Sequence, residues 1–279
     1  MRALGSAQYY RSSYLPWIEV ARVRGSRHSF PKHYHDQSYT VGLIDKGASF
    51  CLGKNADNLA LQGSTVLINP GQIHTGMPAS DADLDYRMIY FDRKILHRMI
   101  NDCRECDTDP EFSQFISDDK DLRSSLDQLA ESVIGLEEAR VHDVLEKECS
   151  LYTVLMNLSR FCSFSGDKDK ISRSDEKISK LKIILSSDLE KQVSLESVSG
   201  RLGISRFQLL RLFKKQYGIT PHVYRTLCRV DKAARLLRDG KSLIYTAVES
   251  GFADQSHFSR TFKNFYGATP GQYARCLTD

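Results

Sequence analysis

The C-terminal third of the chain places apolar residues at the spacing of an α-helix. Leu209 and Phe213 are four residues apart, and Phe258 and Phe262 repeat this spacing. Side chains four residues apart lie on the same face of a helix, so each pair is expected to form a buried stripe. The pattern predicts two amphipathic helices with polar outward faces.

Start and stop signals bracket both helices. Ser205 and Asp254 stand directly before them, and a short oxygen-bearing side chain there can accept hydrogen bonds from the unpaired amides of the first turn. A glycine followed by a proline ends each helix. These residues are Gly218 and Pro221 in the first helix, and Gly267 and Pro270 in the second. A shorter helix is predicted before each of them, at residues 195–202 and 243–250.

An internal repeat connects the two patterns. Residues 205–221 and 254–270 align at a constant offset of 49 residues, with identical residues at many matched positions. A helix, a brief turn that contains glycine and a second helix form a helix-turn-helix unit, whose second helix enters the major groove of DNA. We therefore predict two such units, 195–216 and 243–266, joined by a helix over residues 222–238.

The charge distribution favours a polyanion as the partner of this region. Residues 176–279 contain 18 Lys and Arg against 9 Asp and Glu, a net charge of +9, whereas the whole chain carries +4, so residues 1–175 carry −5. A basic domain attached to an acidic one points to a polyanion as the partner of the basic domain. The helix-turn-helix units make double-stranded DNA the expected polyanion. A rigid joining helix would let the two recognition helices reach successive major-groove segments about 34 Å apart.

The same residues resemble the DNA-binding domain of the AraC/XylS family. The resemblance covers residues 177–275. It rests on Arg-Leu-Phe-Lys-Lys-Gln-Tyr-Gly-Ile-Thr-Pro at 211–221, Ala-Val-Glu-Ser-Gly-Phe at 247–252 and the series from Ser256 to Tyr273. It implies a sequence-specific transcription factor, most often an activator, that acts as a homodimer together with RNA polymerase.

Outward side chains near the start of each recognition helix are the expected base contacts, because the matching positions of the family commonly touch bases. They are Arg206, Phe207, Leu210 and Arg211 in the first unit, and Gln255, Ser256, Ser259 and Arg260 in the second. The arginines are suited to bidentate contacts with guanine and Gln255 to adenine, each worth about 1–3 kcal/mol of discrimination. Phe207 and Leu210 are not polar, so either they contact thymine methyl groups or the first unit discriminates less than the second.

Lysines lie further along both helices. Lys214, Lys215 and Lys263 are expected to meet phosphates, which position the protein on the duplex without reading its sequence.

The N-terminal part alternates apolar and polar residues in short runs. Between Ile18 and Phe91 these runs are separated by glycine and proline, which is typical of an antiparallel barrel or sandwich of short strands. Small barrels of this kind enclose one ligand. The fold class predicted for the chain is α+β in two domains, an antiparallel β-barrel with a helical hairpin followed by an all-α double helix-turn-helix domain; the barrel is expected to be cupin-like because residues 31–36 and 63–74 resemble the two halves of a cupin signature.

Three histidines of the predicted barrel stand in segments that resemble a cupin signature. His33 and His35 lie in residues 31–36, and His74 ends the segment 63–74. Three imidazoles could hold zinc or iron, but the glutamate that follows the His-x-His pair in metal-binding cupins is missing. AraC-type sensor domains share the pattern and typically bind organic effectors without metal. We therefore expect the histidines to contact an effector, with no metal and no cofactor.

Further effector contacts are expected from polar residues of the barrel, namely Arg22, Arg24, Tyr39, Tyr86 and Arg87. An arginine could clamp a carboxylate in bidentate fashion, whereas aromatic rings with hydroxyl partners would suit a sugar. The expected effector is a sugar, an amino acid or another organic acid.

The segment after the barrel predicts a helical hairpin and a linker. Apolar residues at helical spacing indicate helices over 121–134 and 138–161, which either support a dimer or pack on the protein's own barrel. Residues 163–175 are polar and predict an interdomain linker. The domain bounds expected are 1–118 for the barrel, 119–162 for the hairpin, 163–175 for the linker and 176–279 for the DNA-binding domain.

Several classes of protein are not favoured. The chain has no run of eighteen apolar residues, and residues 1–14 lack an apolar stretch behind basic residues. We therefore expect no membrane span and no signal peptide, and a cytoplasmic protein that does not interact with membranes. The pair Cys103 and Cys106 has redox or metal spacing, but no second such pair follows at zinc-site distance. No enzyme is expected and no catalytic residue is assigned. Two alternatives remain: a cupin metalloenzyme fused to a DNA-binding module, and a regulator controlled by a protein partner.

Overall fold

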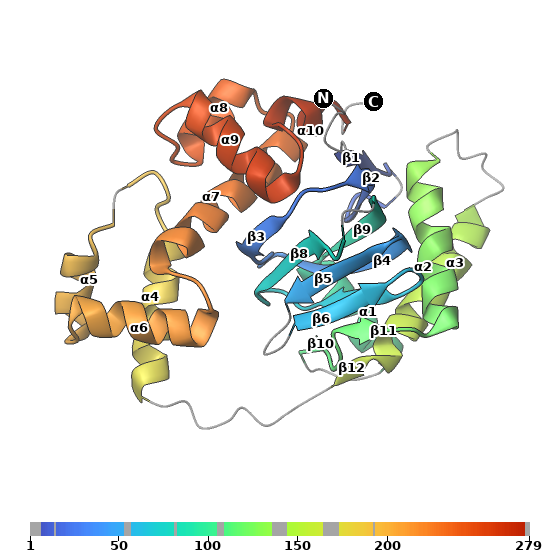
Figure 1. The fold of residues 1–279 in the computed structure, drawn as a ribbon, viewed down its shortest axis with the longest axis horizontal. Coiled ribbons are helices and arrows are strands. Elements are labelled where there is room, and N and C mark those ends of the chain that lie inside the picture. The colour runs from blue at the N-terminus through green and yellow to red at the C-terminus, as the bar shows by residue number, and fades with distance from the viewer. Residues whose placement is uncertain are drawn as a thin grey trace. The chain divides into compact units, whose positions relative to one another are not determined.

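The chain folds into two compact units, Met1–Gly166 and Asp167–Asp279 (Figure 1). The structure, a computed structural model, describes residues 7–13, 15–52, 57–80, 83–104, 109–135, 144–163, 173–191 and 193–276. No helix in this described part has the length and apolar character that crossing a membrane requires.

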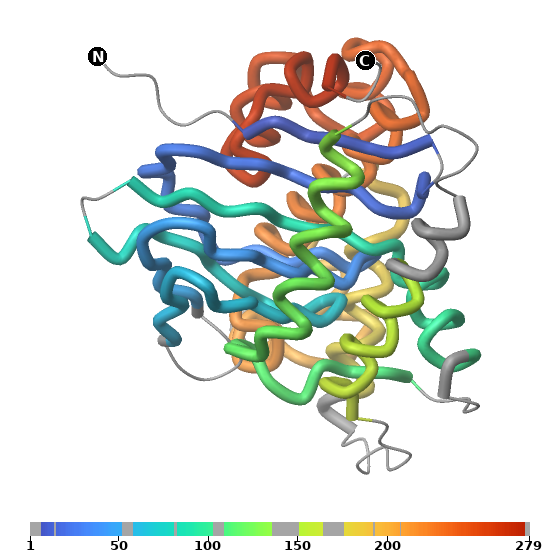
Figure 2. Tube along the Cα trace, turned by 90° about the vertical axis from the view of Figure 1, so that its right-hand side faces the viewer, coloured from blue at the N-terminus to red at the C-terminus, as the bar shows by residue number. Residues whose placement is uncertain are grey.

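Two larger antiparallel sheets build the described part of the N-terminal unit (Figure 2). A six-stranded sheet has the order β1-β2-β9-β4-β7-β11, and a four-stranded sheet has the order β3-β8-β5-β6. The strands of the first sheet are β1 (Ala7–Arg11), β2 (Ile18–Ser26), β9 (Leu84–Asp92), β4 (Ser38–Lys46), β7 (Thr65–Ile68) and β11 (Ile116–Ser117). Those of the second are β3 (Phe30–His33), β8 (His74–Pro78), β5 (Ala48–Leu52) and β6 (Asp57–Leu61). A two-stranded antiparallel sheet of β10 (Glu111–Phe112) and β12 (Cys162–Ser163) accompanies them. The predicted antiparallel β-domain is confirmed.

Strand alternation divides the six-stranded sheet into two faces. Val20, Val41 and Ile89 stand side by side in register, and all three are fully buried in the main core. This face is covered by helices α1 (Arg93–Arg104), α2 (Lys120–Ile134) and α3 (Val144–Arg160). The residues between them along each strand point to the opposite face, because successive strand side chains alternate.

The predicted helical hairpin is present. α2 starts at Lys120 after its N-cap Asp119, and α3 is described from Val144 onward. The predicted start of the second helix at residue 138 lies outside the described residues. The apolar stripes of α2 and α3 are buried against the sheet of their own domain, as Leu126 and Leu155 illustrate. The apolar stripes therefore pack on the protein's own β-domain. A dimer interface would need the outward faces of the two helices.

The second unit contains helices throughout its described residues. They are α4 (Arg173–Ser186), α5 (Leu195–Leu202), α6 (Arg206–Tyr217), α7 (Pro221–Arg238), α8 (Leu243–Glu249), α9 (Gln255–Tyr266) and α10 (Pro270–Cys276). The predicted pairs 195–202 with 205–217 and 243–250 with 254–266 are α5 with α6 and α8 with α9, and the predicted joining helix is α7. α4 begins at Arg173, so the last three residues of the predicted linker are helical.

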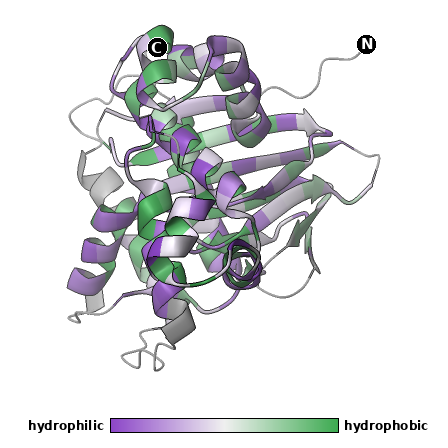
Figure 3. Ribbon diagram, turned by 90° about the vertical axis from the view of Figure 1, so that its left-hand side faces the viewer, coloured by the Kyte–Doolittle hydropathy of each residue, from purple (hydrophilic) through white to green (hydrophobic). Residues whose placement is uncertain are grey.

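The helices of this unit carry both hydrophobic and hydrophilic residues (Figure 3), and each recognition helix has its buried residues on one side. α7 lies at the centre, because it contacts α4 and α6 of the first helix-turn-helix half and α8, α9 and α10 of the second. Its buried residues Leu227, Val230 and Ala234 follow the predicted helical spacing. The two recognition helices are thus held by one continuous element.

Arg225 and Arg229 of α7 attach the chain after α4 to this element. The guanidinium of Arg225 donates to the carbonyl oxygens of Leu185, Ser187, Asp188 and Lys191, and that of Arg229 donates to Leu189. Backbone carbonyls at the end of a helix have no partner within it, so these bonds satisfy them. The first helix-turn-helix half is therefore connected to α7 by polar as well as apolar contacts.

Candidate DNA-binding helices and sensor site

The two recognition helices, α6 and α9, start and end in the same way. The Ser205 hydroxyl accepts from the Gln208 amide at 3.2 Å, and the Asp254 carboxylate accepts from the His257 amide at 2.7 Å. Gly218 and Gly267 follow with left-handed backbone, at φ of 66° and 69°. The predicted caps are confirmed, and they set the same helical register in both copies of the repeat.

The predicted buried stripes are also confirmed. Leu209, Phe213, Phe258 and Phe262 are each fully buried. Aromatic neighbours complete the stripes, since the Phe213 ring contacts Tyr224 and the Phe262 ring contacts Tyr273, the matching tyrosine of the repeat. The opposite face of each helix is left to solvent.

The predicted DNA contacts lie on these outward faces. The exposed ones are Arg206, Arg211, Lys214 and Lys215 on α6, and Gln255, Ser256, Arg260 and Lys263 on α9. Leu210 and Ser259 are half-buried, and the side chain of Phe207 lies outside the described part of the structure. The Arg206 guanidinium is 4.0 Å from the Glu196 carboxylate of α5, an exposed and weak ion pair.

Two further outward residues were missed by the sequence interpretation. Gln208 and His257 are exposed in the first turn of α6 and α9. They are matched by the 49-residue repeat, and each stands three residues before an exposed arginine of the same face, Arg211 or Arg260. The repeat and the helical spacing together could have identified them.

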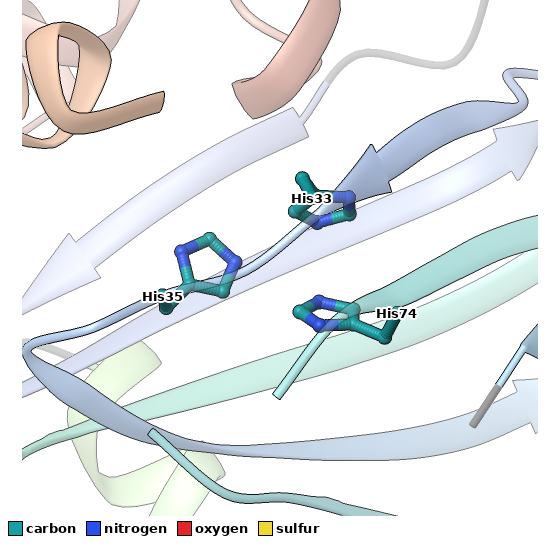
Figure 4. A group of neighbouring side chains, drawn as sticks. All are labelled: His33, His35 and His74. Atoms are coloured by element: carbon teal, nitrogen blue, oxygen red, sulfur yellow. The ribbon is translucent and has the colours of Figure 1, made fainter. Parts of the chain in front are cut away.

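His33, His35 and His74 meet on the N-terminal unit. His33 ends β3 and is paired in register with His74 at the start of β8, while His35 follows β3 by two residues. One ligand nitrogen of each ring lies within 4.8 Å of the others, and all three side chains are buried (Figure 4). The predicted convergence of these histidines is therefore present in the structure.

Backbone carbonyls orient two of these rings. Nδ1 of His33 lies 2.7 Å from the Pro31 oxygen, and Nδ1 of His74 lies 2.9 Å from the Gln72 oxygen. A carbonyl oxygen can only accept, so Nδ1 carries the proton and donates in each ring, which leaves a lone pair on each Nε2.

Burial keeps the same two rings neutral. It lowers the pKa of His33 to about 4, and together with the two neighbouring histidines it lowers the pKa of His74 well below its ordinary value. Both side chains are therefore uncharged near neutral pH.

The face of the six-stranded sheet that points away from helices α1, α2 and α3, here called the inner face, adjoins the histidines. The His35 ring contacts the Tyr90 ring at a centroid distance of 5.3 Å. Tyr86 shares this face of β9 and is buried, which raises the pKa of its hydroxyl and keeps it protonated. Glu19 is paired in register with Tyr90 and is also buried. Tyr90 and Glu19 were missed, although strand alternation from Tyr86 could have identified Tyr90.

The prediction of effector contacts at Arg22, Arg87 and Tyr39 needs correction. These residues lie on the opposite, helix-covered face of the sheet. Arg87 binds Asp45 at 2.6 Å, and both arginines bind Glu131 of α2. The Tyr39 hydroxyl donates to the Pro110 oxygen at 2.6 Å. The error arises because successive residues of a strand point to opposite faces of the sheet, so a shift of one position moves a side chain to the other face. Arg24 is exposed.

Comparisons with known proteins agree with both halves of this description. Residues 15–155 match the AraC-like ligand binding domain, and residues 198–275 match a helix-turn-helix domain. The HTH-type transcriptional regulator YbfI of Bacillus subtilis is 31% identical over 240 residues, which cover 86% of this chain and 85% of YbfI. The HTH-type transcriptional activator RhaS of Mannheimia succiniciproducens is 24% identical over 252 residues, 90% of this chain and 91% of RhaS.

A solved structure with the same fold is ToxT from Vibrio cholerae O395. It superimposes with a TM-score of 0.55 at 18% identity and covers 98% of both chains. ToxT has also been crystallised with an unsaturated fatty acid bound.

A ligand-binding β-domain joined to two helix-turn-helix units defines a transcription regulator. The chain belongs to the AraC/XylS family. Its helix-turn-helix region binds DNA, and its N-terminal domain is the ligand-binding domain of that family.

Proposed function

We propose that this regulator activates transcription by reading two neighbouring major-groove segments with α6 and α9, and that a small organic effector on the N-terminal unit controls it. The observation that carries the DNA half is the matched outward face of the two helices. Arg211 and Arg260 occupy equivalent positions of the repeat, and both are exposed while the stripe behind them is fully buried. Exposed arginines near the start of a capped helix are suited to guanine.

The effector half rests on the inner face of the six-stranded sheet. Neutral His33 and His74 lie beside His35, whose ring contacts Tyr90. Met88 shares the face of Tyr90 and adds apolar surface. A few polar groups on an apolar face suit a small organic molecule such as a sugar, an amino acid or another organic acid. The fatty acid bound by ToxT supports the organic acid.

The proposal includes a homodimer that contacts RNA polymerase. The outward faces of α2 and α3 are available for the dimer, and Tyr152 of α3 is 57% exposed. Sedimentation equilibrium of the full chain tests the dimer, and a monomer at all concentrations would contradict it.

Selection of duplexes from a random library by the full-length protein tests the DNA-reading faces. We expect Arg260→Ala to lose about 1–3 kcal/mol of discrimination at one base pair of the selected duplex. Lys263→Ala should instead weaken selected and random duplexes equally and reduce the salt slope by about one, because a phosphate contact carries no sequence information. Fluorescence anisotropy measures both effects.

Arg98→Ala is the matched control, since it removes an exposed arginine from α1 of the other unit. It should leave the affinity and the salt slope unchanged. Equal losses on selected and random duplexes for both the Arg260 and the Lys263 variants would contradict the assignment of reading and positioning roles.

A further inference from the structure

The three histidines form a compact set of nitrogen donors in a buried position. Their ligand nitrogens lie within 4.8 Å of one another, and each side chain is less than a tenth exposed. The rings of His33 and His74 approach to a centroid distance of 4.2 Å, and His35 lies 5.2 Å from the first and 5.4 Å from the second. Figure 4 shows the three rings around one small region.

The hydrogen bonds of two rings prepare them for coordination. His33 and His74 each donate Nδ1–H to a backbone carbonyl, so Nε2 of each is a lone-pair donor with a fixed ring orientation. Histidines that bind metals almost always donate their other ring N–H to a carbonyl or carboxylate in this way. Because Nδ1 carries the proton in each ring, no proton has to leave Nε2 before a cation binds.

The separation of the ligand nitrogens can be compared with that of a zinc site. Neighbouring nitrogens around zinc are roughly 3.3 Å apart at Zn–N bonds of about 2.0–2.1 Å. The three ligand nitrogens lie within 4.8 Å of one another, so each pair has to close by at most about 1.5 Å to reach this spacing.

Two arginines of the sheet that could have faced the histidines do not supply positive charge to this face. Arg22 and Arg87 are engaged with carboxylates on the helix-covered face, through Glu131 and Asp45. A bound metal ion would therefore provide on the inner face the positive charge that an acidic effector requires.

We propose that His33, His35 and His74 bind one divalent transition-metal ion of the zinc class. Imidazole nitrogen suits zinc, iron, nickel and copper, whereas magnesium and calcium prefer oxygen ligands. Three protein ligands leave the fourth position of a tetrahedral ion open. Water or the acidic group of a small molecule occupies that position, so the ion links the histidines to ligand binding by this unit.

Titration of the full-length, chelator-treated protein with Zn²⁺ and Co²⁺ tests this proposal. We expect one equivalent to bind and the cobalt form to show visible bands of a tetrahedral ion with nitrogen ligands, without the near-ultraviolet charge-transfer band that thiolate ligands give. His33→Gln and His74→Gln should each weaken zinc binding at least about tenfold. His97→Gln, which removes a partly exposed histidine of α1, should leave zinc affinity unchanged.

The outcome does not depend on the stability of the variants. A wild-type protein that binds no equivalent of either ion overturns the proposal, even if a histidine variant fails to fold. The proposal is also overturned if the cobalt form shows the charge-transfer band of thiolate ligands, or if both histidine variants retain the wild-type affinity for zinc. DNA binding by α6 and α9 is measured separately, so failure of the metal site leaves the proposed function standing.

Discussion

At the scale of single residues, Gly251 illustrates how the second helix-turn-helix unit meets the rest of its domain. Its φ of +79° is one that L side chains rarely adopt, and an added Cβ would lie 2.1 Å from the carbonyl oxygen of Leu189. Leu189 follows α4 of the first half, so the turn between α8 and α9 packs directly on that half. A glycine is required here for both conformation and space.

We expect Gly251→Ala to destabilise the C-terminal unit strongly. Gly240→Ala is the matched control, because its φ is +71° and an added Cβ would meet nothing within 4 Å. In the control, the free energy of unfolding should fall by about 1–2 kcal/mol, because alanine adopts the left-handed conformation less easily than glycine. Because of the clash, Gly251→Ala should lower the free energy of unfolding by at least about 2 kcal/mol more than Gly240→Ala does. Urea denaturation of the full chain measures the difference, and equal losses would contradict the close packing.

At the scale of secondary-structure elements, ion pairs connect the six-stranded sheet to α2. Arg87 of β9 contacts Asp45 of β4 and two carboxylates of α2, Asp127 and Glu131. Arg123 of α2 reaches back to Asp45 at 2.6 Å. These pairs lie at the edge of the apolar core, so they define how α2 sits on the sheet.

Arg87→Met tests how much these ion pairs contribute to the stability of the N-terminal unit. The Arg87 side chain is only 9% exposed, and its loss leaves Asp127 and Glu131 with fewer cationic partners. Since Asp45 retains Arg123 and the α2 carboxylates are partly exposed, we expect a loss of about 2–3 kcal/mol in unfolding free energy.

Arg27→Met removes an exposed pair with Asp83 and should change stability by about 1 kcal/mol or less. Thermal unfolding of the two variants measures the contrast. If both had the same small effect, the ion pairs of α2 would have no structural role.

At the scale of the whole molecule, the two units carry different tasks and different charge. The basic C-terminal region suits DNA, whereas residues 1–175 carry a net charge of −5. A ligand can alter DNA binding only if it favours one state of the molecule over another. Effector control therefore requires a measurable free energy of ligand binding in the first unit.

An effector should raise the unfolding temperature of the N-terminal unit. At a concentration 100 times its Kd, a ligand that binds only the folded state adds about 2.7 kcal/mol of stability. Thermal-shift screening of the full chain against sugars, amino acids and fatty acids measures this effect. A broad library that produces no shift would instead favour control by a protein partner.

The helical features of the C-terminal unit could be predicted from sequence because they depend on neighbours in the chain. The caps Ser205 and Asp254 act within one turn, and the stripe from Leu209 to Phe213 depends only on helical spacing. The repeat then related the two copies, which placed Arg211 and Arg260 at equivalent outward positions. The convergence of His33, His35 and His74 followed from their resemblance to a known pattern.

The tertiary structure decided which face of the sheet each residue occupies. Arg22, Arg87 and Tyr39 were expected to contact an effector, but strand pairing places them against α2 and the main core. Glu19 and Tyr90 are far apart in sequence and become neighbours only through the pairing of β2 with β9. Contacts between distant segments decide which strands pair and which face of the sheet each residue occupies. The local sequence does not determine these two features.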